Sequence, residues 1–143
     1  MQVPFDDAQF ASWRQAAEGT LASARHDRAG GFANWACFKA QQASEFALKS
    51  LCRGLGLAAH GHSLIHLRKQ LVDQGLVVAP TVQSDLLLLE QFYLATRYPD
   101  AQPSGQPDQA YDDAMAATAI AAAQRVLAFS DESRATIASG GPA

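Results

Sequence analysis

Apolar side chains dominate residues 32–55 and, at 3.6 residues per turn, they cover most of the circumference of a helix. A helix of this kind is surrounded by other helices, so we expect it to form the core of the fold. One narrow stripe is consistently polar, at spacings of three and four residues that place its members in a row. This polar stripe consists of Gln42, Glu45, Lys49 and Arg53. We expect the chemistry of the protein to involve it.

Four further stretches have apolar residues at helical spacing, and each begins with a residue that suits the start of a helix. They run from Asp6 or Asp7 to about Arg28, from Ser63 to Gly75, from Pro80 to near Arg97, and from Asp108 to residue 134. No stretch alternates in the manner of a strand, so the pattern predicts one all-α domain over residues 1–134. The small residues from Ala135 onward predict a disordered tail over 135–143.

The composition is 48% hydrophobic and 17% charged, which is typical of a globular domain of 143 residues. So low a charged fraction leaves room for a buried interface, which favours self-association. The formal charge of -3 excludes an extended basic surface for nucleic acid and leaves only a local patch open.

Two cysteines, Cys37 and Cys52, lie about 22 Å apart on the same predicted helix, which is too far for a disulfide. We expect them to be buried thiols in a reducing compartment. No apolar stretch approaches the length of a membrane helix, and the first residues lack the pattern of a signal peptide. These features favour a soluble cytoplasmic protein.

Four motifs occur in a familiar order and spacing. They are AQQASEFALKSL on the second predicted helix, HSLIHL at the start of the third, YLATRYPD at the end of the fourth and YDDAMAATAI in the last. In these motifs, from about residue 10 to residue 130, the chain resembles the HEPN domain proteins of higher eukaryotes and prokaryotes. The resemblance implies an up-and-down bundle of four to five helices, commonly a homodimer and often encoded beside a minimal nucleotidyltransferase.

The resemblance also implies two kinds of activity. Some members are associated with nucleotide binding, and many others are metal-independent RNases of toxin–antitoxin or defence systems. Those RNases carry an arginine, four to six intervening residues and then a histidine. Here the arginine is Arg97, whereas Gln102, Pro103 and Ser104 occupy the histidine positions. The chain therefore departs from the motif of the RNases at its catalytic histidine.

The polar stripe has two interpretations. In the first it lines a groove, in which Lys49 and Arg53 hold phosphate by charge-assisted hydrogen bonds. Glu45 then positions Lys49 or a ribose hydroxyl, and Gln42 reads a base edge. In the second it is an exposed helix face, on which Glu45 and Lys49 form a weak surface ion pair. We favour the groove because the rest of the helix is so apolar.

The turn RYPD, residues 97–100, is a second candidate site. Arg97 is placed to bridge to Glu45 or to bind an anionic ligand, while Tyr98 offers a ring and a hydroxyl. Alternatively, Arg97 neutralises the negative end of the helix dipole and Asp100 caps the turn. The two interpretations can coexist.

Three histidines lie close together in the chain: His60, His62 and His66. The last two have the spacing of a helical metal pair, but no carboxylate or thiolate stands at ligand spacing to complete the site. We therefore expect neither a metal nor a cofactor. His62 matches the HSL motif of the family, which implies that it fixes the turn by hydrogen bonding, and we interpret His66 as a surface or interface histidine.

We expect a homodimeric HEPN-like bundle without catalytic residues that binds a nucleotide or partners a minimal nucleotidyltransferase. The expected ligand site consists of Gln42, Glu45, Lys49, Arg53, Arg97, Tyr98 and Asp100. One alternative is an RNase in which one of the three histidines acts as general base beside Arg97. Another is a purely structural dimerisation module in which the polar stripe is an interface.

Overall fold

The computed structural model describes residues 4–103 and 105–140, and the regular structure in these ranges is entirely helical. This confirms the all-α prediction. The five longer helices are α1 (Asp7–Ala29), α2 (Ala33–Gly54), α3 (Leu64–Asp73), α4 (Pro80–Glu90) and α6 (Asp113–Ala138). Between the last two lie a 3₁₀ helix, η1 (Pro99–Ala101), and the short helix α5 (Pro107–Ala110). No helix in the described ranges is long and apolar enough to cross a membrane.

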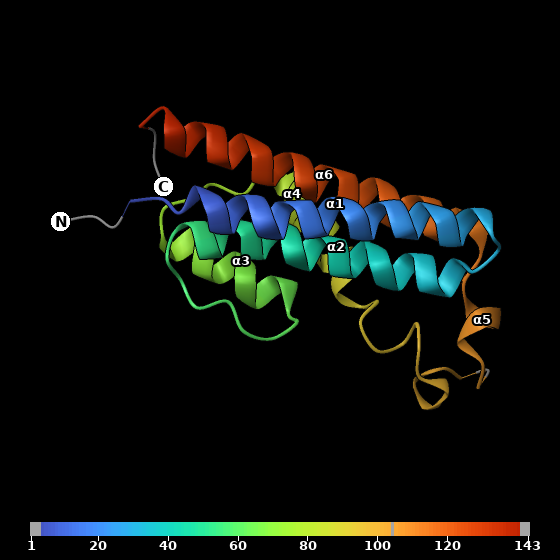
Figure 1. Cartoon of the computed structure of the whole chain (residues 1–143). Helices are drawn as coiled ribbons and strands as arrows, with labels where there is room; N and C mark the ends of the chain where they lie inside the picture. The colour runs from blue at the N-terminus through green and yellow to red at the C-terminus, as the bar shows by residue number, and fades with distance from the viewer. Residues whose placement is uncertain (1–3, 104, 141–143) are drawn as a thin grey trace.

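The three longest helices lie side by side, and α1 runs antiparallel to both α2 and α6 (Figure 1). The turn between α1 and α2 is tight because Gly31 adopts a φ of +85°, which side chains disfavour. Asp6 caps α1 by accepting the backbone N–H of Gln9 at 3.0 Å. Ser63 caps α3 in the same way, from the backbone N–H of His66 at 3.2 Å.

Helix α2 is the centre of the bundle, as predicted, because it contacts α1, α3, α4, α5 and α6. It buries a run of small residues that let its neighbours approach closely: Ala36, Ala40, Ala43 and Ala47. Its two thiols are also fully buried. Burial raises the pKa of Cys37 to about 12 and that of Cys52 to about 11, so both remain neutral at physiological pH.

The segment before α1 packs against the last turn of α2. The backbone N–H of Asp6 donates to the carbonyl of Gly54 at 2.8 Å. A β-carbon at Gly54 would lie 2.2 Å from the ring of Phe5, so the glycine leaves the space that this ring fills. The guanidinium carbon of Arg134 on α6 lies 4.1 Å from the centre of the same ring. The N-terminal segment is therefore held between α2 and α6.

Helix α4 ends at Glu90, well before the predicted stop near Arg97, and residues 91–97 form successive turns. Side chains capture backbone carbonyls here: those of Thr96 and Arg97 each donate to the carbonyl four residues earlier, at 2.6 and 3.0 Å. The buried amide of Asn34 donates to the carbonyl of Thr96 at 2.9 Å and ties the turns to α2. These turns, rather than a helix end, place Arg97.

The last helix begins and ends later than predicted. Asp112, and not Asp108, is its N-cap and accepts the backbone N–H three residues further on at 2.8 Å. Asp108 lies in α5 instead. The predicted tail from Ala135 is helical as far as Ala138. Residues 141–143 of that tail lie outside the described residues.

Candidate functional site

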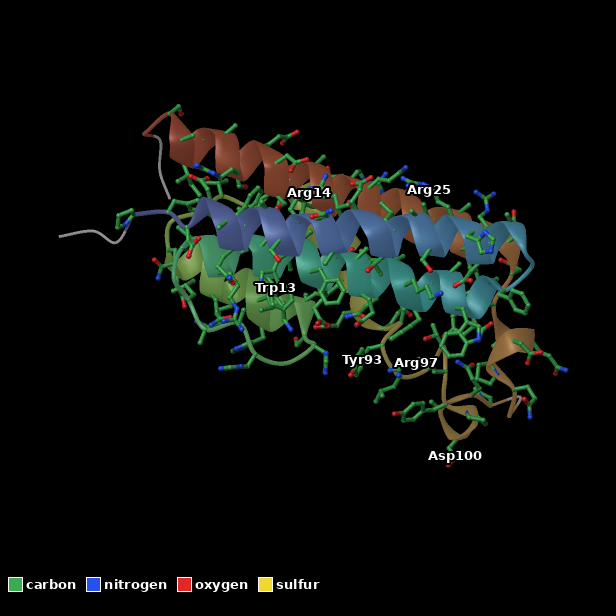
Figure 2. All side chains as sticks on the ribbon, in the orientation of Figure 1. Trp13, Arg14, Arg25, Tyr93, Arg97 and Asp100 are labelled. Carbon is green, nitrogen blue, oxygen red and sulfur yellow. The ribbon has the colours of Figure 1, made fainter. Side chains whose placement is uncertain are left out.

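Three segments meet in one region: the polar stripe of α2, the turn before α3, and residues 91–98 after α4. Figure 2 shows Tyr93 and Arg97 on the side of α2 that faces away from α6. The carboxylate of Glu90 joins two of these segments, because it accepts from the Ser63 hydroxyl at 2.7 Å and from the backbone N–H of Leu64 at 2.8 Å. This contact brings the start of α3 to the end of α4.

Glu45 is the buried centre of this region, with a side chain that is 1% exposed. One carboxylate oxygen accepts from Lys49 Nζ at 3.0 Å. The other lies 3.2 Å from Gln42 Nε2 and 3.1 Å from His62 Nδ1. Lys49 is itself only 9% exposed. The interpretation of the stripe as an exposed helix face is therefore wrong at its centre, where a buried ion pair is hydrogen-bonded on several sides.

His62 connects this buried ion pair to the surface. Its ring stacks on that of Tyr93, with centroids 4.5 Å apart and planes 18° apart. Its side chain is 53% exposed, and no residue of the described ranges bonds its Nε2. The buried amide of Gln41 donates to the His62 carbonyl at 3.2 Å, which fixes the turn. Two hydrogen bonds therefore hold this turn to α2, one at the His62 carbonyl and one at the His62 ring.

Arg97 is surrounded by aromatic rings. Its guanidinium carbon lies 4.0 Å from the ring centre of Phe38, 4.8 Å from that of Tyr93 and 5.2 Å from that of Tyr98. Its Nε and one terminal nitrogen donate to the Tyr93 carbonyl. It forms no ion pair with Glu45, nor with any other carboxylate of the described residues. No carboxylate of the described residues therefore balances the charge of this half-buried guanidinium.

The ring of Tyr93 contacts both His62 and Arg97. Exposed rings lie beside them: Tyr98 is 51% exposed, and Trp35 is 41% exposed and packs edge-on against Phe38. The arrangement places the guanidinium of Arg97, a charged hydrogen-bond donor, beside several aromatic rings. Such a surface suits a ligand that has both an anionic group and a planar ring.

Two of the predicted site residues lie away from Arg97. The guanidinium carbon of Arg53 lies 5.6 Å from the ring centre of Trp13, which Lys49 Nζ also approaches at 5.8 Å, near the opposite end of α2 from Phe38. Asp100 lies in η1, and Figure 2 shows it at the far tip of the connection below Arg97. The structure therefore brings together Gln42, Glu45 and Lys49 in one cluster, and Arg97 with Tyr98 in another. His62 and Tyr93 join the two clusters.

Sequence reasoning missed Phe38 and Tyr93 as site residues, because both occupy apolar positions of predicted helices. A signal for Tyr93 exists in the chain, since it precedes Arg97 by four residues, a spacing at which side chains can meet. Phe38 approaches Arg97 only through the packing of α2 on the 91–98 turns. Nothing in the local sequence indicates that contact.

Gln102, at the first of the histidine positions of the RNase motif, has a structural role here. Its Nε2 donates to the carbonyl of Ala95 and to the hydroxyl of Tyr111, the latter at 3.1 Å. The Tyr111 ring packs edge-on against Phe92, with centroids 6.0 Å apart. Gln102 thus ties the Arg97 turns to the start of α6. Ser104, another of those positions, lies outside the described residues.

Metal binding finds no support among the described residues, where no three His, Cys, Asp or Glu side chains gather in a group that could hold an ion. His60 and His66 are both exposed. Each of them is separate from the contact that His62 makes with Glu45 and Tyr93.

Comparisons with known proteins give a consistent result. The model of the HEPN domain matches residues 10–133. No curated protein matches the chain.

Solved structures also match. TT1696 from Thermus thermophilus is 36% identical, with a TM-score of 0.83, over 87% of this chain and 98% of its own. ST0689, an archaeal HEPN homologue, is 31% identical, with a TM-score of 0.71, over 86% and 95%. An HEPN domain protein from Thermotoga maritima, tm0613, is 30% identical, with a TM-score of 0.69, over 85% and 95%. The chain therefore belongs to the HEPN domain family.

Proposed function

We propose that this chain is a non-catalytic HEPN domain that binds a nucleotide around Arg97 and Tyr93. The setting of Arg97 carries the proposal, because its guanidinium stacks among three rings and pairs with no carboxylate of the described ranges. A guanidinium in this state binds phosphate strongly, and neighbouring ring faces stack on a base.

Each side chain has a distinct role in this proposal. Arg97 binds the phosphate, and the exposed ring of Tyr98 or Trp35 stacks on the base. His62, stacked on the same Tyr93 ring, presents its Nε2 to the ligand, and in its doubly protonated form this nitrogen donates to phosphate while Nδ1 donates to Glu45. Lys49 does not contact the ligand, because Glu45 already neutralises it in a buried pair. The buried ion pair positions His62 instead.

The proposal includes a protein partner on the strength of family membership alone. This partner is a minimal nucleotidyltransferase, in a toxin–antitoxin or stress-response setting, and the chain itself is a homodimer. Affinity purification of the tagged chain from its native host, followed by mass spectrometry, tests this part. Recovery of a nucleotidyltransferase with the wild-type chain supports the partnership, and its absence counts against it.

A thermal-shift screen tests nucleotide binding directly. The purified protein is heated with AMP, ADP, ATP and the corresponding guanine nucleotides, and its unfolding midpoint is recorded. A nucleotide at about 100 times its Kd stabilises the folded state by about 2.7 kcal/mol, which raises the midpoint by roughly 5 to 10 °C at this chain length. We expect the rise to disappear in Arg97→Ala.

Arg53→Ala is the matched control, because this arginine also stacks on an aromatic ring but lies on Trp13, outside the site. It should keep the full shift. Equal loss in both variants would show that binding depends on net charge and not on the Arg97 site. No shift with any nucleotide would contradict nucleotide binding.

One observation favours a second candidate function, a metal-independent RNase. His62 and Arg97 each lie against the ring of Tyr93, so one tyrosine connects a histidine to the arginine although the sequence motif lacks its histidine. In such an enzyme His62 would act as general base, and Arg97 would stabilise the charge that develops on the phosphate.

Incubation of labelled single-stranded RNA with the protein in EDTA tests this candidate. Cleavage that is lost in both His62→Ala and Arg97→Ala but kept in His66→Ala would support the RNase. Intact RNA with the wild-type protein leaves nucleotide binding as the better function.

A further inference from the structure

A groove of about 450 Å³ lies between α1 and α2. Its α1 side consists of small residues, and its α2 side includes the rings of Phe38 and Phe46. Phe38 also contacts Arg97, whose guanidinium carbon lies 4.0 Å from the centre of the ring. The groove therefore adjoins the proposed nucleotide site, and Phe38 is common to both.

Aromatic pairs mark the two ends of this groove. Phe38 packs edge-on against Trp35, with ring centroids 6.2 Å apart, and Phe46 packs against Trp13 at 5.8 Å. On α2, Trp35, Phe38, Gln42 and Phe46 follow one another at spacings of three and four, so they form one row. At 1.5 Å per residue, Phe38 and Phe46 are about 12 Å apart along the helix, which leaves room for a planar base between them.

Gly19 lies in the middle of α1 and lines the groove. Glycine destabilises the interior of a helix relative to alanine. Neither backbone conformation nor packing explains it here, because its φ is not positive and a β-carbon at this position would have no heavy atom of the described residues within 4 Å. Close approach of a ligand to the backbone is a further reason for a glycine, and the open groove beside Gly19 fits this reason.

The side-chain amide of Gln42 presents an acceptor at the groove. Its Nε2 donates to Gln41 Oε1 at 2.7 Å and to Glu45 Oε1 at 3.2 Å, so both of its hydrogens are used. An ionised carboxylate only accepts, which requires the nitrogen of the amide to face Glu45. No donor of the described residues bonds the Gln42 oxygen. This oxygen is therefore the atom that Gln42 presents to a ligand.

Two hydroxyl groups of α1 complete the polar lining. Thr20 donates its hydrogen to the carbonyl of Ala16 at 2.8 Å, so its oxygen only accepts from a ligand. Ser23 accepts from Lys39 Nζ at 2.9 Å, and its own hydrogen remains available to donate. Together with the amide oxygen of α2, the groove thus presents two acceptors and one donor.

This pattern fits one base better than the others. The Watson–Crick edge of guanine carries two N–H donors side by side and one carbonyl acceptor, whereas the same edge of adenine carries one donor amine and an acceptor nitrogen. A lining with two acceptors and one donor complements the edge of guanine.

We propose that the α1–α2 groove binds the base of the nucleotide and selects guanine. The inference rests on the proposed function, because Arg97 holds the phosphate on the other side of Phe38. Gly19 leaves room for the base beside the backbone of α1, and Gln42 accepts from its N–H donors. Trp35, which packs against Phe38 and is 41% exposed, is then the ring that stacks on the base.

Isothermal calorimetry with GTP, ITP and inorganic triphosphate tests the proposal. ITP is GTP without the exocyclic amine, and inorganic triphosphate lacks the base altogether. We expect wild-type protein to bind GTP at least about tenfold more tightly than ITP, because the acceptors of the groove are left unpaired by ITP. This comparison needs no variant, so it does not depend on how a substitution affects folding.

Gly19→Leu fills the groove, and the space around this position accommodates the new side chain. It should weaken GTP binding at least about tenfold and leave the affinity for inorganic triphosphate unchanged. Ala22→Leu is the matched control, because it adds the same side chain at an exposed position of α1 that does not line the groove. It should bind GTP like the wild type.

Gln42→Ala separates recognition of the base from a structural role. We expect the preference for GTP over ITP to shrink toward unity, since the acceptor for the exocyclic amine is lost. A purely structural role for Gln42, through its contact with Glu45, would weaken both nucleotides alike and leave their ratio unchanged.

The outcomes distinguish this inference from the proposed function. GTP binding that Arg97→Ala abolishes but Gly19→Leu does not weaken overturns the base groove and leaves the nucleotide site at Arg97 intact. Equal affinity of the wild type for GTP and ITP overturns the selection of guanine. Wild-type protein that binds no nucleotide contradicts the proposed function, and the inference fails with it.

Discussion

Arginine is used differently on the two sides of α2. On the side of α1 and α6, Arg14, Arg28 and Arg134 each bind a carboxylate of another helix. On the side of α3 and the 91–98 turns, Arg97 binds three rings and a backbone carbonyl. The three arginines of the first side join α1 to α6, whereas Arg97 presents a cation to a ligand.

The difference is visible in the electrostatics. Hydrogen bonds to the Asp131 carboxylate raise the pKa of Arg14, and those from Arg28 lower the pKa of Asp113, because each pair stabilises both charged forms. Each arginine of such a pair has its charge balanced by its partner. Aromatic rings attract Arg97 without cancelling its charge, which remains available to an external anion. Arg97 therefore differs from the paired arginines of α1 and α6 both in lacking a carboxylate partner among the described residues and in lying among three rings.

The largest expected effect comes from Glu45→Ala, which leaves Lys49 buried without a partner. We expect a loss of about 3 to 5 kcal/mol in the free energy of unfolding, measured by urea denaturation. Asp73→Ala is the matched control, because Lys69 and Asp73 have the same four-residue spacing and a 3.1 Å contact but are exposed. It should cost less than about 1 kcal/mol. Equal losses would show that burial of the Glu45 pair has no consequence.

The next effect concerns pH and the buried thiols of α2, which have no ionic partner. Because folding raises the pKa of Cys52 to about 11, only the unfolded chain releases this proton just above pH 9. The contribution of Cys52 to stability should therefore be constant below that pH and be lost, by on the order of 1 to 3 kcal/mol, as the pH rises to 11. Urea denaturation at intervals across this range measures the fall. It should be smaller in Cys52→Ala, and an unchanged slope in that variant would contradict the assignment.

Arg97→Lys sharpens the comparison at the proposed nucleotide site. Lysine keeps the charge but loses the planar fork and its stacking on Phe38 and Tyr93. We expect nucleotide affinity to fall about tenfold, which is about 1.4 kcal/mol, in isothermal calorimetry. Unchanged affinity would mean that charge alone, and not the ring setting, defines the site.

The smallest effect is expected from Arg14→Ala on the carboxylate-paired side. Its partner Asp131 is 53% exposed, so solvent screens the pair, and the loss should be below about 1 kcal/mol. Thermal unfolding at low and high salt measures it. The difference between variant and wild type should shrink at high salt, and a difference that salt does not alter would indicate lost packing and not a lost ion pair.

Most of the fold is predictable from the sequence because its signals are local. Helix α2 is apolar on most sides, and the caps at Asp6 and Ser63 are single residues before an apolar run. The end of α4 is not predictable in this way. The turns that follow it are tied to α2 by Asn34, which lies far away in the chain and donates to the carbonyl of Thr96. Asp108 and Asp112 are both good caps locally, so the sequence alone does not decide between them.

The candidate site is partly predictable for the same reason. Spacing along α2 indicates that Glu45 and Lys49 meet, and the structure places them 3.0 Å apart. Whether such a pair is buried depends on α3 and on the turn at His62, which spacing does not show. The ring setting of Arg97 combines side chains of α2 with the 91–98 turns. Contacts of this kind follow from tertiary packing and not from any pattern in one helix.

The contact between Gly54 and the ring of Phe5 has a consequence for how the molecule opens. Because Arg134 also lies against that ring, the segment before α1, the last turn of α2 and the last turns of α6 all contact one aromatic side chain. Loss of this ring releases all three together. We therefore expect their backbone amides to exchange with solvent as one cooperative unit, so that a change at the N-terminus is detected at the far end of the sequence.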